Sequence, residues 1–318
     1  MQPLPPRRRL LHRGMFGFLT RSRSITRIAL TPPAPQPGRG GVALVLIVKN
    51  EARHIAEWAR FHAAAGVAHI HVYDNGSTDG TVQVIRDAVG DLCSVIPWDQ
   101  KLRDARRGLE IHNQVLAYAH ATRNFGGHYR WMSFIDVDEF LVPKQAASLP
   151  EALAHLEHCS NISLPWHMFG RSGHQVAPEG GVVQNYTLRN PDPMSDAKGL
   201  RNFKMIVDPC AVTAIKVHEI ETGGGITCND RGQPFTQKSR CQRDFYSADH
   251  IQLNHYYTRS DAELRAKIAR GPNLTTPDAD HLRRVLRKVE AIEAGEVEDR
   301  AAQQFLARCN GGGRWKSN

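Results

Sequence analysis

The sequence predicts an α/β fold in which parallel strands alternate with helices. Residues 42–48 are a run of seven apolar residues that ends in a polar segment, and residues 131–135 are a second apolar run that ends in acidic residues. Strands that are buried on both faces read as continuous apolar stretches. Between these runs, strand and helix patterns alternate over residues 42–89, which is typical of a right-handed βαβ unit.

The first predicted strand, Val42–Val48, leads into a predicted helix. Asn50 is the expected N-cap, because a short polar side chain can accept a hydrogen bond from the first helical turn. Apolar residues then recur at helical spacing from Ile55 to Ala65, and Gly66 supplies the stop. The pattern predicts a helix of about fifteen residues.

A second strand is predicted over residues 67–73, followed by a polar turn. Ser77 or Thr78 is expected to cap a helix that continues through Val89. Ligands of open α/β sheets bind at the carboxyl ends of the strands. The polar residues of this turn are therefore expected at the ligand-binding edge of the sheet.

Two carboxylates, Asp136 and Asp138, follow the second apolar run at spacing i, i+2. Alternation along a strand puts such residues on one face, so both side chains are expected to point together from the strand's end. Glu51 and Asp74 fall on the same edge. Mg²⁺ and Mn²⁺ prefer carboxylate and phosphate oxygens. The pair indicates a divalent-metal site, although an Asp-x-Asp triplet also occurs by chance in many loops.

Several ordered motifs carry a resemblance to a known family. Their order and spacing over residues 42–272 resemble GT-A glycosyltransferases related to family 2 and, more narrowly, glycosyltransferase family 92 and its bacterial relatives. The resemblance implies a GT-A (Rossmann-like) nucleotide-sugar-binding domain with a mixed central sheet, followed by C-terminal helices. The motifs are Leu46–Ala52, Tyr73–Thr81, Phe134–Leu141, Trp166, Phe169-Gly170, Ser172-Gly173, Lys204, His218, Asn254–Ser260, Lys267 and Gly271.

The resemblance also implies a metal centre. Asp136 would reach the ribose or the metal, and Asp138 would bind the Mn²⁺ or Mg²⁺ ion that bridges the two phosphates of a nucleotide diphosphate. His255 would complete the metal shell. The chain has 16 histidines, and without the motif His255 would be interpreted as a surface or core residue.

The same resemblance assigns a set of polar residues to the donor. Carboxylates accept from the N–H and hydroxyl groups of a base and ribose, and basic side chains neutralise phosphate. The alternatives are turn chemistry for Asp79, solvated surface positions for Lys204 and Arg259, and a half-buried strand position for His218. The donor-binding set is Glu51, Asp74, Asp79, Asp136, Lys204, His218 and Arg259.

The acceptor side is less defined by the sequence. Trp166 and Phe169 are either core residues or an apolar platform for a sugar face. The resemblance favours inversion, which requires a carboxylate base near the acceptor hydroxyl. The sequence does not rank the candidates for this base, which are Asp196, Asp192, Glu219 and Glu179.

Together these features predict a metal-dependent glycosyltransferase that moves a sugar from a nucleotide-diphosphate donor, expected to be a UDP-sugar, to a glycan, a lipid-linked acceptor or another hydroxyl. One alternative is a metal-dependent nucleotidyltransferase, although no Gly-Ser or basic fingerprint for a triphosphate is evident. The other is a non-catalytic nucleotide-sugar-binding scaffold, which the presence of Asp136, Asp138 and His255 disfavours.

Charge is unevenly distributed along the chain. Residues 1–40 contain eight arginines and no acidic residue, which accounts for most of the formal net charge of +9. The remaining charges nearly cancel, so a nucleic-acid-binding surface is not expected. Arginines interrupt each apolar stretch of this arm, so neither a signal peptide nor a membrane span is predicted there. The arm is expected to be disordered, with a start at Met15 or contact with anionic lipid as alternatives.

The six cysteines show no CxxC pair or zinc-type spacing. They are interpreted as free thiols in a reducing, cytoplasmic compartment, with peripheral contact at the inner membrane face as an alternative location. A disulfide such as Cys228 to Cys241 is left open.

The C-terminal region is predicted to be helical. Ser260 and Glu263 have capping-box spacing, and Gly271-Pro272 is expected to end that helix. Further helices are predicted from Asp278 to Ala294 and up to Cys309, as packing elements or an oligomer surface rather than a catalytic part. The predicted organisation is an arm (1–40), a GT-A domain (41–272), a helical extension (273–310) and a flexible tail (311–318).

Overall fold

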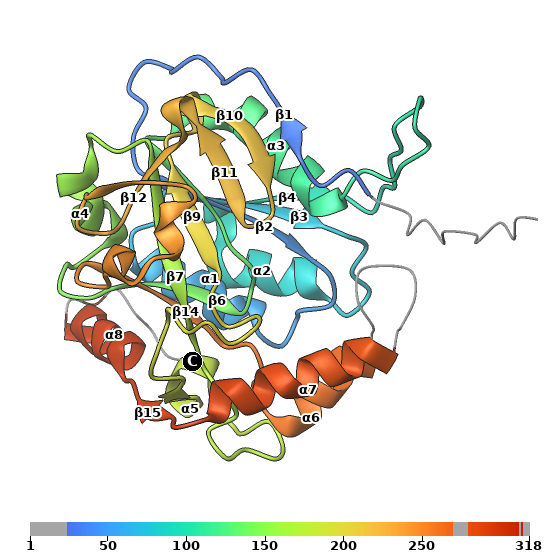
Figure 1. Cartoon of the computed structure of the whole chain (residues 1–318), viewed down its shortest axis with the longest axis vertical. Helices are drawn as coiled ribbons and strands as arrows, with labels where there is room; N and C mark the ends of the chain where they lie inside the picture. The colour runs from blue at the N-terminus through green and yellow to red at the C-terminus, as the bar shows by residue number, and fades with distance from the viewer. Residues whose placement is uncertain (1–23, 270–278, 312, 314–318) are drawn as a thin grey trace, which may run out of the picture.

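The computed structural model describes residues 24–269, 279–311 and 313, and it shows a central sheet with helices packed on both faces (Figure 1). The helices are α1 (Ile55–Ala64), α2 (Thr81–Val89), α3 (Asn113–Phe125), α4 (Leu149–Leu153), α5 (Val182–Asn185), α6 (Asp261–Ala269), α7 (Ala279–Glu293) and α8 (Ala301–Gly311). The strands are β1 (Ile28–Ala29), β2 (Val42–Val48), β3 (His69–Asp74), β4 (Cys93–Pro97), β5 (Trp131–Phe134), β6 (Glu139–Pro143), β7 (Asn161–Met168), β8 (Leu188–Arg189), β9 (Phe203–Val207), β10 (Val212–Lys216), β11 (Glu219–Thr222), β12 (Ile226–Cys228), β13 (Pro234–Thr236), β14 (Ile251–His255) and β15 (Val297–Glu298).

The main sheet is mixed. Its strand order is β13-β12-β7-β9-β5-β2-β3-β4, and β14 joins β7 to β6. Strands β4, β3, β2 and β5 are parallel, whereas β9 runs antiparallel to both β5 and β7. The predicted fold class, an α/β domain with a mixed central sheet followed by C-terminal helices, is confirmed.

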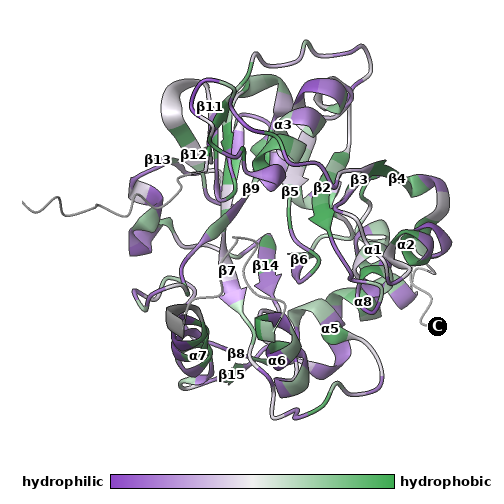
Figure 2. Ribbon diagram, turned by 90° about the vertical axis from the view of Figure 1, so that its right-hand side faces the viewer, coloured by the Kyte–Doolittle hydropathy of each residue, from purple (hydrophilic) through white to green (hydrophobic). Residues whose placement is uncertain are grey.

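The core lies on both faces of this sheet, as β2 illustrates. Leu44 and Leu46 pack in the cluster that contains Trp58 of α1, whereas Val45 packs in the cluster that contains Tyr118 of α3. Figure 2 shows the hydrophobic β2 between these helices. A strand buried on both faces has no polar alternation, which is why its apolar run predicted it residue for residue.

The predicted helix caps are wrong. Asn50 has a positive φ of 56°, and its side-chain oxygen accepts from the N–H of Thr78 at 2.8 Å instead of capping α1. Ser77 accepts in turn from the N–H of Asn50 at 3.0 Å. The first turn of α2 is satisfied by Asp79, which accepts from the N–H of Thr81 at 3.0 Å. The two loops at the carboxyl ends of β2 and β3 therefore bond to each other, a long-range contact that local capping rules do not reveal.

The prediction of a disordered arm over residues 1–40 is wrong for residues 24–40. β1 pairs antiparallel with β10, and the Arg39 guanidinium donates to both carboxylate oxygens of Asp208, at 2.7 and 2.8 Å. A strand of two residues has no readable periodicity, and its partner is distant in the sequence. Residues 1–23, to which the lipid-contact and start-site alternatives apply, lie outside the described residues.

The interpretation of all cysteines as free thiols is also wrong. Cys159 and Cys228 form a disulfide that joins the segment before β7 to β12, and the Cys228–Cys241 alternative is not observed. The cause is a strand pairing: β12 runs beside β7 with Cys228 opposite Ile162. Their sequence separation of 69 residues hides this proximity from a search for closely spaced cysteines.

The C-terminal helices follow the prediction. Ser260 accepts from the N–H of Glu263 at 3.3 Å, and Glu263 accepts from the N–H of Ser260 at 3.1 Å, which confirms the capping box. Helices α6 and α7 pack through Leu264, Val285 and Val289. The expected stop at Gly271-Pro272 lies outside the described residues. None of the described helices has the length and apolar content needed to cross a membrane.

Candidate active site

The chain turns sharply between β5 and β6, and we call residues 136–139 the acidic turn. The N–H of Asp136 donates to the Glu139 carboxylate at 2.7 Å, and the N–H of Glu139 donates to the Asp136 carbonyl at 3.0 Å. Asp136 and Asp138 therefore lie in a turn rather than on a continuing strand. The two side chains, which were expected to point together, have separate sets of partners.

Asp136 is bonded on both oxygens. Gln114 of α3 donates to one at 2.9 Å, and Lys204 of β9 donates to the other at 2.9 Å. The Lys204 side chain is fully buried and also lies 3.2 Å from a Glu139 oxygen. The solvated surface position given above as the alternative for Lys204 is therefore wrong, and the charge of Lys204 is matched by the acidic turn itself.

Glu139 is a part of the site that sequence reasoning missed. Its side chain is fully buried and accepts from the indole N–H of Trp166 at 2.7 Å. Burial raises the pKa of Glu139 above its usual value, against the opposing effect of Lys204. An acid inside the otherwise apolar segment 139–143 was the available signal, since acids are rarely buried without partners.

Asp138 and His255 lie side by side, as the motifs predicted. One Asp138 oxygen is 3.6 Å from His255 Nε2 and 3.2 Å from Lys267 Nζ. The pairing of β14 with β6 produces this contact, because it sets His255 opposite Glu139. Burial alone would raise the pKa of Asp138, but Lys267 and His255 hold it well below its usual range.

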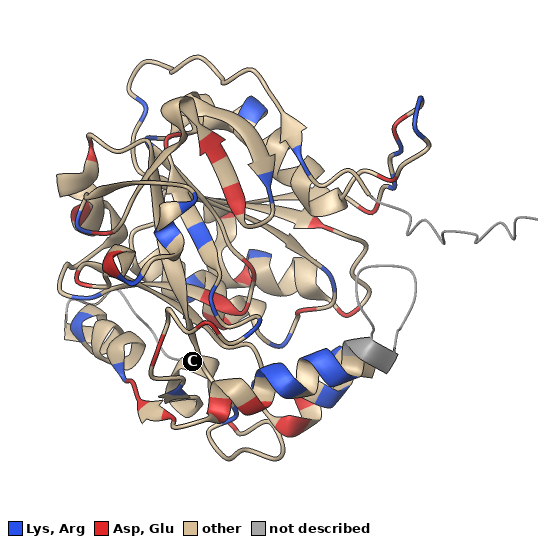
Figure 3. Ribbon diagram, in the orientation of Figure 1, with Lys and Arg blue, Asp and Glu red and all other residues tan. Residues whose placement is uncertain are grey.

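Two lysines of the C-terminal helices lie beside the site. Lys267 belongs to the motifs that carry the family resemblance but was given no role, and Lys288 was not singled out in the sequence. Lys267 of α6 and Lys288 of α7 lie 4.3 and 3.8 Å from the centroid of the Tyr257 ring. Lys288 also lies 5.1 Å from the Trp166 ring. The helices α6 and α7, the second of which was expected to serve for packing or assembly, thus place one lysine each beside the candidate site. Figure 3 shows how basic residues gather along α7.

The aromatic residues divide between site and core. The Trp166 ring is 4.3 Å from the His255 ring and 5.3 Å from His218, centroid to centroid. Burial lowers the pKa of His218 to about 3, so its ring is neutral. Phe169 is fully buried and packs on Tyr256 at 4.6 Å, so its interpretation as an acceptor platform is wrong and the core alternative is correct.

The pair Asp138 and His255 fits a divalent cation. Two ligand atoms at right angles on such an ion lie about 3 Å apart, so a small side-chain shift from 3.6 Å is sufficient. Lys267 already presents a positive charge to the same oxygen. Asp136 is bonded elsewhere, and the three predicted ligands are not a compact triad. Within the described residues, three metal-ligand side chains lie close together at His158, Cys159 and Cys228. The two cysteines of this group are joined by the disulfide.

The other predicted donor residues lie at the carboxyl ends of β2 and β3. Glu51 is 3.5 Å from the Arg259 guanidinium, so the solvated position considered for Arg259 is wrong. Asp74 accepts from the N–H of Ser77 at 3.1 Å. Asp79 accepts from the N–H groups of Ala52 and Thr81, which is the turn chemistry given above as its alternative.

The candidate bases are not brought to the acidic turn. Asp192 pairs with Arg243, Asp196 with Arg201, and Glu219 with Lys216, whereas Glu179 is exposed. Within the described part of the chain, no hydrogen bond or ion pair joins any of these four to residues 136–139. The structure therefore does not select a base among them.

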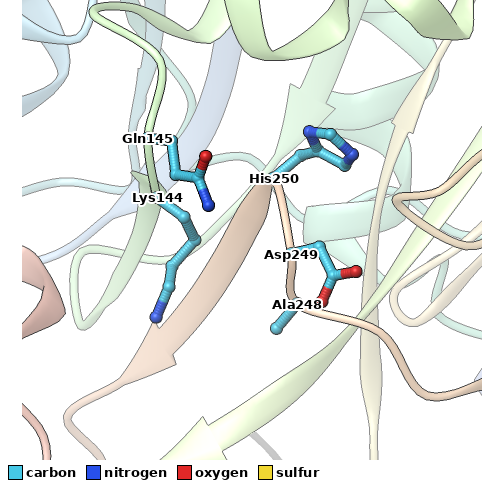
Figure 4. A pocket seen from close by; sticks show the side chains of 5 residues that line it. All are labelled: Lys144, Gln145, Ala248, Asp249 and His250. Atoms are coloured by element: carbon cyan, nitrogen blue, oxygen red, sulfur yellow. The ribbon is translucent and has the colours of Figure 1, made fainter.

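A separate surface pocket is lined by Lys144, Gln145, Ala248, Asp249 and His250 (Figure 4). It lies at the opposite end of the β6–β14 pair from the acidic turn, since Pro143 pairs with Ile251 there and Glu139 pairs with His255 at the other end. This pocket contains none of the predicted site residues.

Comparisons with known proteins agree on one family. A family model described as Glycosyltransferase family 92 matches residues 43–288. A family 92 protein of Ricinus communis is 28% identical over 201 residues, which cover 58% of this chain and 33% of that protein. Family 92 proteins of Oryza sativa subsp. japonica and Arabidopsis thaliana are each 26% identical, over 60% and 54% of this chain and 32% and 29% of their own lengths. The chain thus spans about a third of the curated relatives it matches.

Solved structures give weaker likenesses. A mycobacterial protein has a TM-score of 0.35 and 16% identity, covering 71% of this chain and 70% of that chain. The 4-diphosphocytidyl-2C-methyl-D-erythritol synthase of Anaerococcus prevotii has a TM-score of 0.28 and 9% identity, covering 54% of this chain and 72% of that chain. The family match rests on the sequence similarity.

Proposed function

The chain belongs to glycosyltransferase family 92, and from this membership we propose that it transfers a sugar from a nucleotide-diphosphate donor to an acceptor hydroxyl with the help of Mn²⁺ or Mg²⁺. The observation that carries the proposal is the contact between Asp138 and His255, which come from distant parts of the sequence and meet at the end of the central sheet. A carboxylate and an imidazole suit a divalent cation that keeps further sites open for phosphate oxygens.

Asp138 and His255 would hold the cation, which when bound acts as a Lewis acid on the leaving diphosphate. The residues around them fix the turn that presents Asp138. Lys204 joins Asp136 to Glu139, and Glu139 is bonded in turn to Trp166. A charged network of this kind preorganises ligands, because each side chain is restrained by a partner.

Asp136 is proposed to accept from the donor's ribose or to contact the metal through water. Its side chain is 35% exposed although both oxygens are bonded, so it can reach a ligand without leaving Lys204. Glu51 and Asp74, at the carboxyl ends of β2 and β3, are proposed to accept from the base and ribose. A UDP-sugar donor, a glycan or lipid-linked acceptor, and inversion are parts of the same proposal that rest on family resemblance.

A screen of nucleotide sugars with and without Mn²⁺ tests this function. The wild-type protein should hydrolyse or transfer at least one sugar in a metal-dependent way. Asp138→Asn should lose about 100-fold or more of this activity with an unchanged circular dichroism spectrum, because a charged ligand is replaced by a neutral one of the same shape. Asp249→Asn, at the pocket on the opposite end of β14, should keep wild-type activity.

The outcome against the proposal is wild-type turnover by Asp138→Asn in saturating Mn²⁺. Supplying a nucleoside triphosphate with a sugar phosphate in a parallel reaction tests the nucleotidyltransferase alternative, whose product would be a nucleotide sugar and pyrophosphate. Binding of nucleotide sugars without any turnover would favour the scaffold alternative.

A further inference from the structure

Two ammonium groups from different helices meet at the ring of Tyr257, beside the candidate metal ligands. Lys267 of α6 contacts an Asp138 oxygen at 3.2 Å and donates to the Tyr257 carbonyl at 3.2 Å. Lys288 of α7 lies 3.8 Å from the centre of the same ring. The two helices pack against each other through Leu264, Val285 and Val289. This packing places both lysines at the Tyr257 ring.

The positive charge of this pair exceeds the negative charge offered to it. Among the described residues, the Lys288 ammonium makes no hydrogen bond or ion pair, and its contacts are with the Tyr257 and Trp166 rings. Asp138 is the carboxylate in contact with Lys267. Like charges held close in a partly buried site destabilise the protein unless an anion binds between them. Both lysines therefore indicate an anionic ligand.

The imbalance grows when a divalent cation binds. The cation would bind the same Asp138 oxygen that Lys267 contacts. The Lys267 ammonium would then lie close to a doubly charged ion. A diphosphate offers several charged oxygens to a cation and to ammonium groups at once. The family match ends at residue 288 and therefore includes both lysines. It extends past the domain boundary predicted at residue 272, so that Lys288 falls inside the matched region.

Building on the proposed function, we propose that Lys267 and Lys288 bind the diphosphate of the donor, with Lys267 moving from Asp138 to a phosphate oxygen when metal and donor enter. The lysines neutralise the diphosphate as it leaves. Helices α6 and α7 are then part of the donor site, and not only a packing layer.

Isothermal titration of the full chain with inorganic pyrophosphate in constant Mn²⁺ tests the proposal. Lys288→Gln and Lys267→Gln should each weaken pyrophosphate binding by about tenfold or more, because each loses a charge-assisted hydrogen bond. Arg287→Gln removes one exposed charge from the same helix and serves as the matched control, with wild-type affinity expected. Titration with Mn²⁺ alone should give equal or tighter binding to the lysine variants, because a competing positive charge is gone.

The two affinities separate a ligand-binding role from a structural one. A variant damaged in its fold would bind both Mn²⁺ and pyrophosphate more weakly, and this result would overturn the proposal, as would wild-type pyrophosphate affinity in Lys288→Gln or absence of pyrophosphate binding by the wild type. If the predicted losses occur but no nucleotide sugar is turned over, the anion site stands and the proposed function fails. If nucleotide sugar is turned over equally by Lys288→Gln and Arg287→Gln, the function stands and the lysine proposal fails.

Discussion

Lys204 is the residue whose surroundings define the acidic turn most strongly. Its side chain has no exposed surface and lies between Asp136, at 2.9 Å, and Glu139, at 3.2 Å. Burial alone would lower the pKa of Lys204, but these carboxylates raise it well above its usual value. The position of the charge points to a role in orienting the turn rather than in contacting the donor.

Lys204→Met should destabilise the protein by about 3–5 kcal/mol, because it leaves buried carboxylate charge without its cation. Urea unfolding followed by circular dichroism measures this loss. The double variant Lys204→Met, Glu139→Gln should recover part of it, since the most buried charge is then removed as well. A single variant as stable as wild type would contradict the assignment.

His71 is a second residue whose chemistry follows from burial. It lies on β3, its ring stacks on Phe125 at 4.4 Å, and neither ring nitrogen has a hydrogen-bond partner among the described residues. Burial, with smaller effects from neighbouring histidines, lowers the pKa of His71 to about 3. The ring is therefore neutral in the folded protein and titrates near pH 6.5 when unfolded.

This difference predicts a pH dependence of stability. Below pH 6.5 the unfolded chain binds a proton at His71 that the folded protein does not bind. The contribution of His71 to the free energy of unfolding is therefore complete above pH 6.5 and is lost as the pH falls towards 3. His71→Phe should remove about 1.4 kcal/mol of the stability difference between pH 7.5 and 5.5, measured by urea unfolding. Equal differences for the variant and the wild type would show that His71 is protonated or exposed in the folded state.

At the scale of elements, the sequence predicted those features that depend on local patterns and missed those that depend on long-range contacts. β2 and the end of α2 at Val89 were predicted correctly because burial on both faces and helical periodicity are local patterns. The cap of α1 was missed because Asn50 bonds across to the next loop. Lys288 gave a signal that was not used: it follows Val285 and precedes Val289 and Ile292 on the buried stripe of α7, where a lysine has no packing reason.

The N-terminal segment gives a prediction at the same scale. Deleting residues 1–40 should lower the melting temperature relative to deleting residues 1–23, because it removes β1 from β10 and Arg39 from Asp208. A loss of about 1–3 kcal/mol is expected from the paired backbone and the part-buried ion pair. Differential scanning calorimetry of the two truncated proteins compares them directly, and equal melting temperatures would mean that this pairing does not stabilise the fold.

At the scale of the whole molecule, strand pairing assembles the site from distant segments. β14 runs antiparallel to β6 and parallel to β7, which brings His255 to the acidic turn and to Trp166 at the same time. The motif could predict that Asp138 and His255 share a site, because family resemblance carries that information. The contacts of Glu139, Lys267 and Lys288 could not be predicted in this way, since they depend on how β6, α6 and α7 pack.

The central claim is that Asp138 and His255 hold one cation that also binds the donor's diphosphate. Isothermal titration with UDP, with and without Mn²⁺, tests it in the wild type, in His255→Ala, and in His250→Ala as a control at the exposed opposite end of β14. His255→Ala should weaken Mn²⁺ binding and the Mn²⁺-dependent part of UDP binding in parallel, by about 10- to 100-fold, whereas His250→Ala should match wild type. An undiminished Mn²⁺-dependent gain in UDP affinity in His255→Ala would contradict the claim and make His255 a structural histidine.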